Sequence, residues 1–351
     1  MRRGLISWSR AELPEAVLEA RVCAAQAAMT AAKLDALVVL TNPSRTAGVS
    51  HFTGFVPYWN EGLLVIPSRG LPSLVSALSN RVVDWIQRNA HVTSVTSNPR
   101  IGAEAAAIVA RTCAKARIGV VDLSRLPITV TEALSSGGHS LHDASDLMAH
   151  LRASPDPAEI ALAARAAHIA QRALSLIAPD EQNAAGAVAA LDGEARRLGA
   201  EEVYPAVALD LTRSLHLVRL EGAPRFGAVS AVRASIAYKG VWVRMTRTLA
   251  RDAGSTAAIE MASQRFAAAV SRLPHTADLA RCRTWLIEGC RTTVPLEPMS
   301  GSAIADALPL APGAVVSVQA TIEQDGLPVL LGAPVLLGAS GGCASVLAMP
   351  V

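Results

Sequence analysis

The chain has 351 residues and a formal net charge of +3, and aromatic side chains make up only 3% of it. This length predicts two domains or one large domain with a full hydrophobic core, and the scarcity of aromatics predicts layers packed by small side chains. Because the arginines are dispersed and no basic stripe carries interleaved aromatic residues, the composition excludes a nucleic-acid-binding surface.

The cysteines and the N-terminal residues indicate in which cellular compartment the protein is expected. The 5 cysteines are odd in number and no pair has the C-x-x-C spacing of a zinc or redox site, so we expect buried, reduced thiols. The segment Trp8-Ser9-Arg10-Ala11-Glu12 interrupts any apolar core near the N-terminus, which argues against a signal peptide. No apolar run approaches the ~18 residues that span a bilayer. We therefore expect a cytoplasmic protein without a membrane partner.

In the first 150 residues, helical and strand patterns alternate. Apolar residues at helical spacing or in short buried runs mark these elements. Helices are predicted over residues 13–33, 81–88 and 103–114, and strands over residues 34–40, 62–67, 74–76, 91–95 and 117–122. This alternation predicts an α/β domain.

Two proline residues mark the start of the second part of the chain. Pro155 and Pro157, followed by Glu159 in an acidic first turn, predict a boundary near residue 150 and a long alanine-rich helix that ends at Ala173. We therefore expect domains over residues 1–150 and 151–351. Further helices are predicted over residues 184–198, 256–271 (with Ser255 as N-cap) and 277–287.

A strand, tight turn and strand are predicted between Val232 and Leu249, with Lys239-Gly240 as the turn. The end of this hairpin reads Gly-x-x-x-x-Met-Thr-Arg-Thr-Leu and resembles the signature of the creatinase, aminopeptidase P and prolidase family. The motifs Leu-Asp-Ala-Leu-Val-Val, Phe-Thr-Gly-Phe, Gly-Leu-Leu-Val-Ile and Ile-Gly-Val-Val-Asp follow the order of the creatinase-type N-terminal domain, and residues 310–319 are similar to a later strand of the family.

The resemblance covers the chain from about residue 15 to residue 340. It implies a mixed α/β fold, in which a creatinase-type N-terminal α/β domain precedes a "pita-bread" domain whose curved antiparallel sheet is covered by helices. It also implies a homodimer.

Metal-dependent members of this family hold metal ions with two Asp, one His and two Glu side chains. The two Asp positions, 11 residues apart (244 − 233 = 11), correspond here to Arg233 and Arg244. The resemblance places Ser302 at the His position, Gln319 at one Glu position and about Gly332 at the other. Since a guanidinium cannot be neutralised at accessible pH and repels a dication, we expect no metal and no other cofactor.

His216 is the candidate catalytic residue. It precedes Arg233 by 17 residues (233 − 216 = 17), the separation at which the family's substrate-facing histidine stands. In creatinase, a metal-free member, the matching histidine is the proton shuttle for C–N bond hydrolysis, a role that suits a group titrating near neutrality. The Gly and Asn that usually precede this histidine are absent, and a solvated or hydrogen-bonded loop histidine is the alternative.

The two arginines reverse the polarity of the expected site. Thr246 and Gln319 stand where a creatinase-type enzyme carries carboxylates that hold a cationic guanidino substrate, so creatine itself is not expected. We expect Arg233 and Arg244 to grip a carboxylate, phosphate or other anion, with Ser302 as a further ligand-binding residue. Alternatively, the arginines face solvent or form ordinary ion pairs with Glu201, Glu202 or Glu323.

An aromatic loop contains Tyr58 and Trp59. In the family, the N-terminal domain of one subunit reaches over the partner's pocket, so the resemblance implies that this loop walls the ligand site in a homodimer. The alternative is ordinary packing of two aromatic side chains.

These observations leave three functions open, and whether the chain is an enzyme is undecided. The first is a metal-independent creatinase-like or aminopeptidase P-like protein that binds a small anionic ligand derived from an amino acid, either without catalysis or with C–N bond chemistry through His216. The second is an active metal-free hydrolase or lyase of the creatinase type. The third, a pita-bread metallopeptidase, is disfavoured because all five ligands are replaced.

Overall fold

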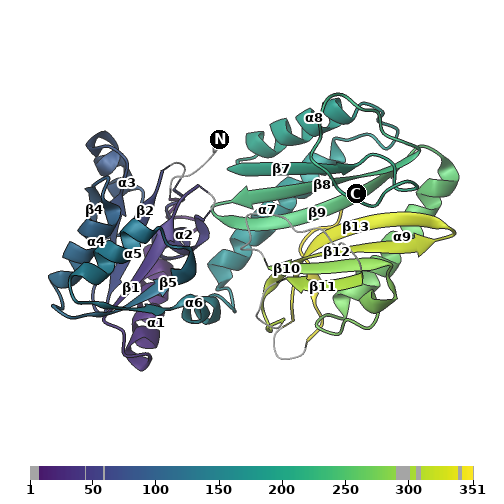
Figure 1. Cartoon of the computed structure of the whole chain (residues 1–351). Coiled ribbons are helices and arrows are strands. Elements are labelled where there is room, and N and C mark those ends of the chain that lie inside the picture. Colours follow the sequence, from purple (N-terminus) through teal and green to yellow (C-terminus); the bar gives the residue numbers. More distant parts are fainter. Residues whose placement is uncertain are drawn as a thin grey trace. The chain divides into compact units, whose positions relative to one another are not determined.

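The computed structural model describes residues 8–43, 45–57, 60–289, 310–338 and 342–350, and the backbone of Gly301–Ala305. The chain forms two compact units and passes from one to the other between Ala153 and Ser154 (Figure 1). Each unit has its own sheet and its own hydrophobic core. The mixed α/β fold class expected from the sequence is confirmed.

The N-terminal unit is built on a six-stranded sheet with the order β4-β3-β2-β1-β5-β6. The strands are β1 (Ala36–Thr41), β2 (Gly62–Pro67), β3 (Ser73–Ser76), β4 (Ser94–Ser97), β5 (Arg117–Val121) and β6 (Ser140–Asp143). The β1–β2 and β2–β3 pairs are antiparallel, and the β3–β4, β1–β5 and β5–β6 pairs are parallel. Parallel pairs need crossover connections, which the helices supply.

Helices cover both faces of this sheet, as an α/β unit with parallel pairs requires. They are α1 (Glu15–Ala31), α2 (Ala47–Thr53), α3 (Val83–Arg88), α4 (Ile101–Ala110), α5 (Ile128–Ser136) and α6 (Ser145–Leu151). Successive β1 side chains alternate between two cores: Leu37 packs with Val22 and Met29 of α1, whereas Val38 packs with Val109 of α4 and Leu134 of α5.

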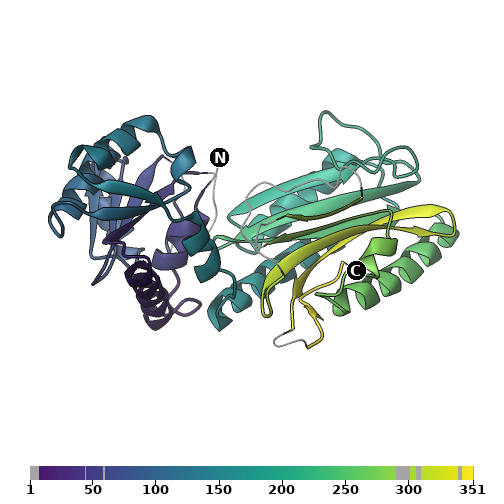
Figure 2. The ribbon, with the colours of Figure 1, turned by 60° about the horizontal axis from the view of Figure 1, so that its bottom comes forward.

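The C-terminal unit is built on an eight-stranded sheet with the order β11-β10-β12-β13-β9-β8-β7 and with β14 paired to β13. The strands are β7 (Glu202–Ala208), β8 (Val229–Tyr238), β9 (Val241–Ala250), β10 (Thr284–Gly289), β11 (Gly301–Ala305), β12 (Val315–Gln324), β13 (Leu327–Leu336) and β14 (Ser345–Val346). All described pairs are antiparallel except β10–β11. Figure 2 shows the sheet bending along its length.

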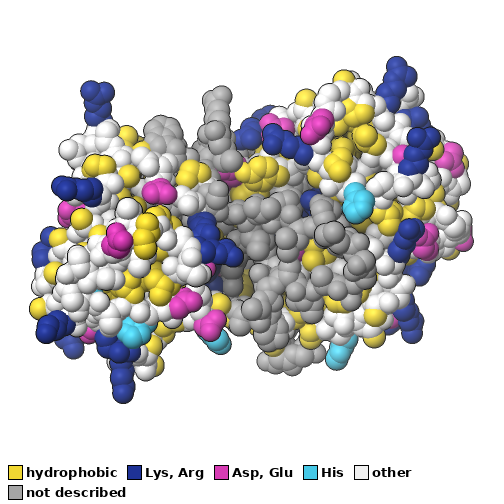
Figure 3. Space-filling view, in the orientation of Figure 1, with side chains coloured by type: hydrophobic (Ala, Val, Ile, Leu, Met, Phe, Trp, Pro, Cys, Tyr) yellow, Lys and Arg dark blue, Asp and Glu magenta, His cyan; other side chains and the backbone are white. Residues whose placement is uncertain are grey.

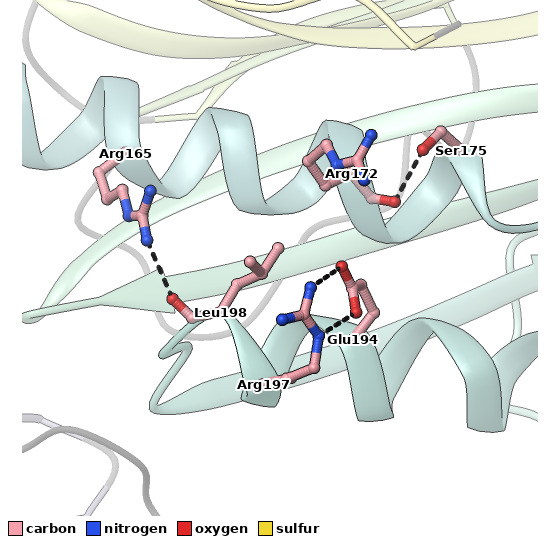
Figure 4. Close-up of polar contacts among 6 residues, drawn as sticks. All are labelled: Arg165, Arg172, Ser175, Glu194, Arg197 and Leu198. Carbon is pink, nitrogen blue, oxygen red and sulfur yellow. Dashed lines mark hydrogen bonds and ion pairs between the residues drawn. The ribbon is translucent and has the colours of Figure 1, made fainter.

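Three helices, α7 (Pro157–Ser175), α8 (Ala184–Arg197) and α9 (Ala253–Ser271), pack against one face of this sheet. The α7 helix begins where the sequence predicts, because Asp156 caps it by accepting a hydrogen bond from the Glu159 N–H at 2.9 Å. Figure 4 shows α7 and α8 side by side, with Nη2 of Arg165 donating to the Leu198 carbonyl at 3.4 Å.

The β8–β9 hairpin has the turn that its sequence predicts. Lys239 and Gly240 both have positive φ, at 50° and 82°. Two such residues form the turn type whose twist matches the flanking strands, and glycine adopts it without strain. Oε1 of the buried Glu201 accepts the Gly240 N–H at 2.6 Å, which fixes the turn to the neighbouring segment.

Two sequence predictions in this unit are wrong. Residues 277–287 do not form a helix but a short turn followed by strand β10, because Trp285 and Ile287 pack into the core beneath β12. The N-cap of α9 is Asp252 rather than Ser255, because the Asp252 carboxylate accepts the Ser255 N–H at 2.8 Å.

None of the helices in the described ranges is long and apolar enough to cross a bilayer. On the face shown in Figure 3, Lys and Arg side chains lie scattered among Asp and Glu.

Candidate functional site

The C-terminal sheet has one apolar face and one polar face. Because side chains alternate along a strand, the odd-numbered residues of β9, such as Val243 and Met245, pack toward α7 and α8. The even-numbered ones, such as Arg244 and Thr246, project from the opposite face. We call that side the polar face; its buried polar residues are Glu202, Arg233, Ser235, Arg244, Thr246, Thr248, Glu288, Ser317, Gln319 and Thr321.

One row of the polar face crosses four neighbouring strands. Arg233 of β8 lies opposite Thr246 of β9, Thr246 lies opposite Gly332 of β13, and Gly332 lies opposite Gln319 of β12. Directly opposite residues of antiparallel strands project to the same side of a sheet. Segments far apart in the sequence therefore place these residues in line.

Hydrogen bonds tie this row together at Gln319. Its Oε1 accepts from Nη1 of Arg233 at 3.4 Å and from Oγ1 of Thr246 at 3.2 Å. Arg233 and Thr246 are only 2% and 1% exposed. The Arg233 guanidinium thus lies in an environment of low dielectric, where its charge acts strongly.

Arg244 lies in the next row, opposite Ser235. Its Nε is 3.5 Å from Oε2 of Glu288 on β10, and both side chains are buried. Its backbone N–H donates to Oγ of Ser317 at 2.9 Å. Glu288 therefore places a carboxylate beside this guanidinium, and Ser317 fixes the adjacent β9 backbone.

The strands β9 and β13 approach closely where Gly332 meets Thr246. A Cβ at position 332 would lie 2.9 Å from Oγ1 of Thr246 and 3.1 Å from its backbone N, so a larger residue requires a local shift. Next to this point, Oγ1 of Thr248 donates to the Leu330 carbonyl at 2.7 Å and accepts the Leu330 N–H at 3.0 Å. Glycine at position 332 therefore allows β9 and β13 to pair closely, so that the polar face is continuous across these two strands.

The residues of this face do not fit a divalent metal ion. Sites for divalent transition metals need several anionic oxygens or imidazoles. Arg233, Arg244, Gln319 and Gly332, which the sequence resemblance places at four of the expected ligand positions, offer two guanidiniums, an amide and no side chain. A guanidinium offers no lone pair to a cation and adds repulsion. Within the described ranges, no group of three or more His, Cys, Asp or Glu side chains is placed to hold a metal ion.

His216 lies outside the arginine rows. Its side chain is exposed, and its backbone N–H donates to Oγ of Ser214 at 3.2 Å. The next residue, Leu217, is the buried one and packs with Ala206 and Ala231 at one end of the polar face. Among the described residues, no contact joins the His216 imidazole to Arg233 or Arg244.

Three other residues expected at the site are Ser302, Tyr58 and Trp59. Ser302 lies on β11 opposite Trp285, and only its backbone is described. Tyr58 and Trp59 lie outside the described residues. Of the alternative partners for the arginines, Glu323 pairs with Arg283 at 2.9 Å.

Sequence reasoning missed Glu288, Ser235 and Ser317. Glu288 falls in the stretch predicted as a helix, so nothing placed it beside Arg244. Ser235 precedes the turn by a few residues on β8, and the hairpin register alone would have put it opposite Arg244. Ser317 lies two residues before Gln319 on β12, so strand alternation predicts that the two share a face.

Comparison with known proteins agrees with this architecture. Residues 21–154 match the model of the creatinase/prolidase N-terminal domain. No curated protein sequence matches the chain.

Solved structures resemble the chain over nearly its full length. Prolidase from Pyrococcus horikoshii OT3 is 14% identical, with 95% of this chain and 99% of that chain covered and a TM-score of 0.71. X-Pro aminopeptidase from Thermotoga maritima MSB8 is 16% identical, with coverages of 92% and 98% and a TM-score of 0.70. Xaa-Pro dipeptidase from Bacillus anthracis is 18% identical, with coverages of 94% and 97% and a TM-score of 0.69.

These identities are low, so the likeness to the solved structures is one of fold. The N-terminal match and the shared fold nevertheless point the same way. The N-terminal unit thus carries a domain of the creatinase/prolidase type over residues 21–154, and the C-terminal unit has the pita-bread fold seen in the prolidases and X-Pro aminopeptidases that the chain resembles.

Proposed function

We propose that this chain is a metal-independent member of the family that binds a small anionic ligand, derived from an amino acid, on the polar face of its C-terminal sheet. The observation that carries the proposal is the burial of two guanidiniums, Arg233 and Arg244, in adjacent rows of that face. A guanidinium presents a fork of N–H donors that matches a carboxylate or phosphate.

The local charge supports an anion. Arg244 faces the carboxylate of Glu288, whereas Nη1 of Arg233 donates to the neutral amide of Gln319. Burial of both guanidiniums makes their attraction for a bound anion stronger than it would be in water.

The position of His216 supports binding rather than catalysis. A general acid or base must come within hydrogen-bond reach of the reacting group. The exposed His216 imidazole has no described contact with the arginines that would hold the ligand. The metal-free hydrolase therefore remains the second candidate, and a metallopeptidase the third, because the donor set of the face does not suit a metal.

Matched probes test this proposal. N-acetylglycine carries a carboxylate, and N-acetylglycinamide is its neutral counterpart. We expect titration calorimetry to show binding of N-acetylglycine but not of the amide, and Arg233→Gln to weaken binding about tenfold or more. Arg281→Gln is the control, because Arg281 is exposed and pairs with Asp278 away from the polar face. The proposal is contradicted if the wild-type protein binds both probes with equal affinity. It is also contradicted if N-acetylglycine binds wild type and Arg233→Gln with equal affinity.

Turnover distinguishes the second candidate. We expect mass spectrometry to show N-acetylglycine unchanged after long incubation with the wild-type protein. Cleavage that is lost in His216→Gln would instead favour the metal-free hydrolase.

A further inference from the structure

A second row of the polar face links Arg244 to an aromatic side chain. Tyr204 of β7 lies opposite Ser235 of β8, and Ser235 lies opposite Arg244 of β9. The three side chains therefore project to the same side in a line. With adjacent strands roughly 4.8 Å apart, positions 204 and 244 are separated by about 10 Å, which suits a small molecule with two distinct ends.

The far end of this row is an aromatic platform made of Tyr204 and Trp242. Their rings are stacked, with centroids 5.5 Å apart and an interplanar angle of 11°. Trp242 is 3% exposed and lies two residues before Arg244 on β9, so it belongs to the same face. Tyr204 is 36% exposed. The buried Trp242 ring thus supports a tyrosine ring that remains accessible to a ligand.

The middle of the row is a buried hydroxyl. Ser235 is 0% exposed, and its Oγ has no hydrogen-bond partner among the residues that the structure describes. A buried hydroxyl without a partner costs free energy, so such groups in native proteins usually serve a bound molecule or water. Ser235 lies between the cation and the aromatic platform and can donate to a carbonyl oxygen there.

We propose that the ligand is an N-acylated amino acid with an aromatic acyl group. Its carboxylate lies at Arg244 and Arg233, its amide oxygen accepts a hydrogen bond from Oγ of Ser235, and its aromatic ring packs on Tyr204. This inference rests on the anion-binding function proposed above and adds two specificity-determining residues, Tyr204 and Ser235. The order of the three groups along the row matches the order of carboxylate, amide and ring in such a molecule.

The test compares N-benzoylglycine with N-acetylglycine, which has the same carboxylate and amide but no ring. We expect calorimetry to show N-benzoylglycine binding the wild-type protein about 3- to 10-fold more tightly. Tyr204→Leu removes this preference, whereas Tyr204→Phe keeps it, because the phenyl ring still stacks on Trp242.

The hydroxyl has its own test. Ser235→Ala is expected to weaken binding of both probes about 3- to 10-fold while leaving the melting temperature of the free protein unchanged or higher, since it removes an unsatisfied polar group. The control Ser230→Ala changes a buried serine on the same strand that faces the other side of the sheet, and leaves binding unchanged.

The outcomes separate this inference from the function on which it rests. Suppose that both probes bind with equal affinity, that Arg233→Gln weakens the binding, and that Tyr204→Leu and Ser235→Ala leave it unchanged. The proposed ligand class is then wrong, whereas anion binding is supported. If neither probe binds, or if both bind independently of Arg233, both proposals are wrong.

Discussion

Nη1 of Arg233 on β8 lies 3.4 Å from Oε1 of Gln319 on β12, although β9 and β13 stand between these strands. The two long side chains reach across the polar face and meet above Thr246, whose hydroxyl donates to the same oxygen. Gln319 thus orients the Arg233 guanidinium through a neutral amide oxygen.

The substitution Gln319→Glu follows from this contact. A carboxylate at 319 would pair with Arg233 and remove the charge that attracts the ligand, so we expect N-acetylglycine binding about tenfold weaker or worse, with a melting temperature unchanged or raised. Gln324→Glu is the matched control, because Oε1 of Gln324 also accepts from an arginine, Nη1 of Arg265 at 2.9 Å, at the end of the same strand. Calorimetry that shows unchanged binding in Gln319→Glu would contradict the role given to Arg233.

The buried pair of Arg244 and Glu288 predicts a non-additive effect on stability. Glu288→Leu leaves a buried guanidinium facing an apolar group and is expected to cost about 3–5 kcal/mol of the free energy of unfolding. The double variant Arg244→Met/Glu288→Leu is expected to recover most of this loss, because apolar groups of similar volume replace both charges. Denaturant unfolding measures the double variant and the two single variants, Arg244→Met and Glu288→Leu; a double variant whose loss of stability equals the sum of the two single losses would show that the pair does not interact.

Arg247 in the family-like motif has a structural role on the apolar face. Its Nη1 donates to the carbonyls of Leu174 at 3.0 Å and Ile177 at 2.7 Å, at the C-terminal end of α7. Burial lowers the pKa of Arg247, but a guanidinium stays charged at accessible pH. We expect Arg247→Met to cost about 2–3 kcal/mol in unfolding free energy, because it removes two charge-assisted bonds that satisfy helix-end carbonyls.

A binding measurement distinguishes this structural role of Arg247 from a role in the ligand site. Calorimetry on folded Arg247→Met should give the wild-type affinity for N-acetylglycine. A variant of full stability that no longer binds the probe would place Arg247 in the ligand site instead.

The cap of α9 predicts a pH dependence. The hydrogen bond from the Ser255 N–H holds the pKa of Asp252 below its ordinary value of 3.8. A carboxyl whose pKa is lowered in the folded state contributes stability that is complete above its ordinary pKa and is lost as the pH falls through the lowered one.

The variant Asp252→Asn keeps a side-chain oxygen for the cap but does not titrate. We therefore expect wild type to lose stability relative to Asp252→Asn as the pH is lowered from 5 to about 3. The measurement is the free energy of unfolding of both proteins across this pH range. A constant difference between them would show that the carboxylate charge does not contribute to stability.

The sequence predicted the architecture well because its signals are local. The Lys239-Gly240 turn and the Asp156 cap are set by neighbouring residues, and the structure confirms both the β8–β9 hairpin and the start of α7. The failure at residues 277–287 has a tertiary cause. Trp285 and Ile287 adopt a strand because β12 offers an open edge, and residue spacing carries no information about that edge.

The candidate site was less accessible to prediction. The motif spacing located Arg233 and Arg244, but it gave neither the contact with Gln319 nor the pairing of Arg244 with Glu288, which join residues more than forty positions apart (288 − 244 = 44). Such contacts depend on strand order, which emerges only when the sheet is assembled. The roles of His216 and Ser302 remain predictions.

The most direct test of the account is calorimetric titration of N-acetylglycine into the wild-type protein and into Arg233→Gln, with and without excess Mn²⁺. The account predicts one binding event per chain, the same affinity in the presence and absence of Mn²⁺, and a loss of about tenfold or more in Arg233→Gln. Binding that appears only after Mn²⁺ is added, or that is unchanged in Arg233→Gln, would contradict it.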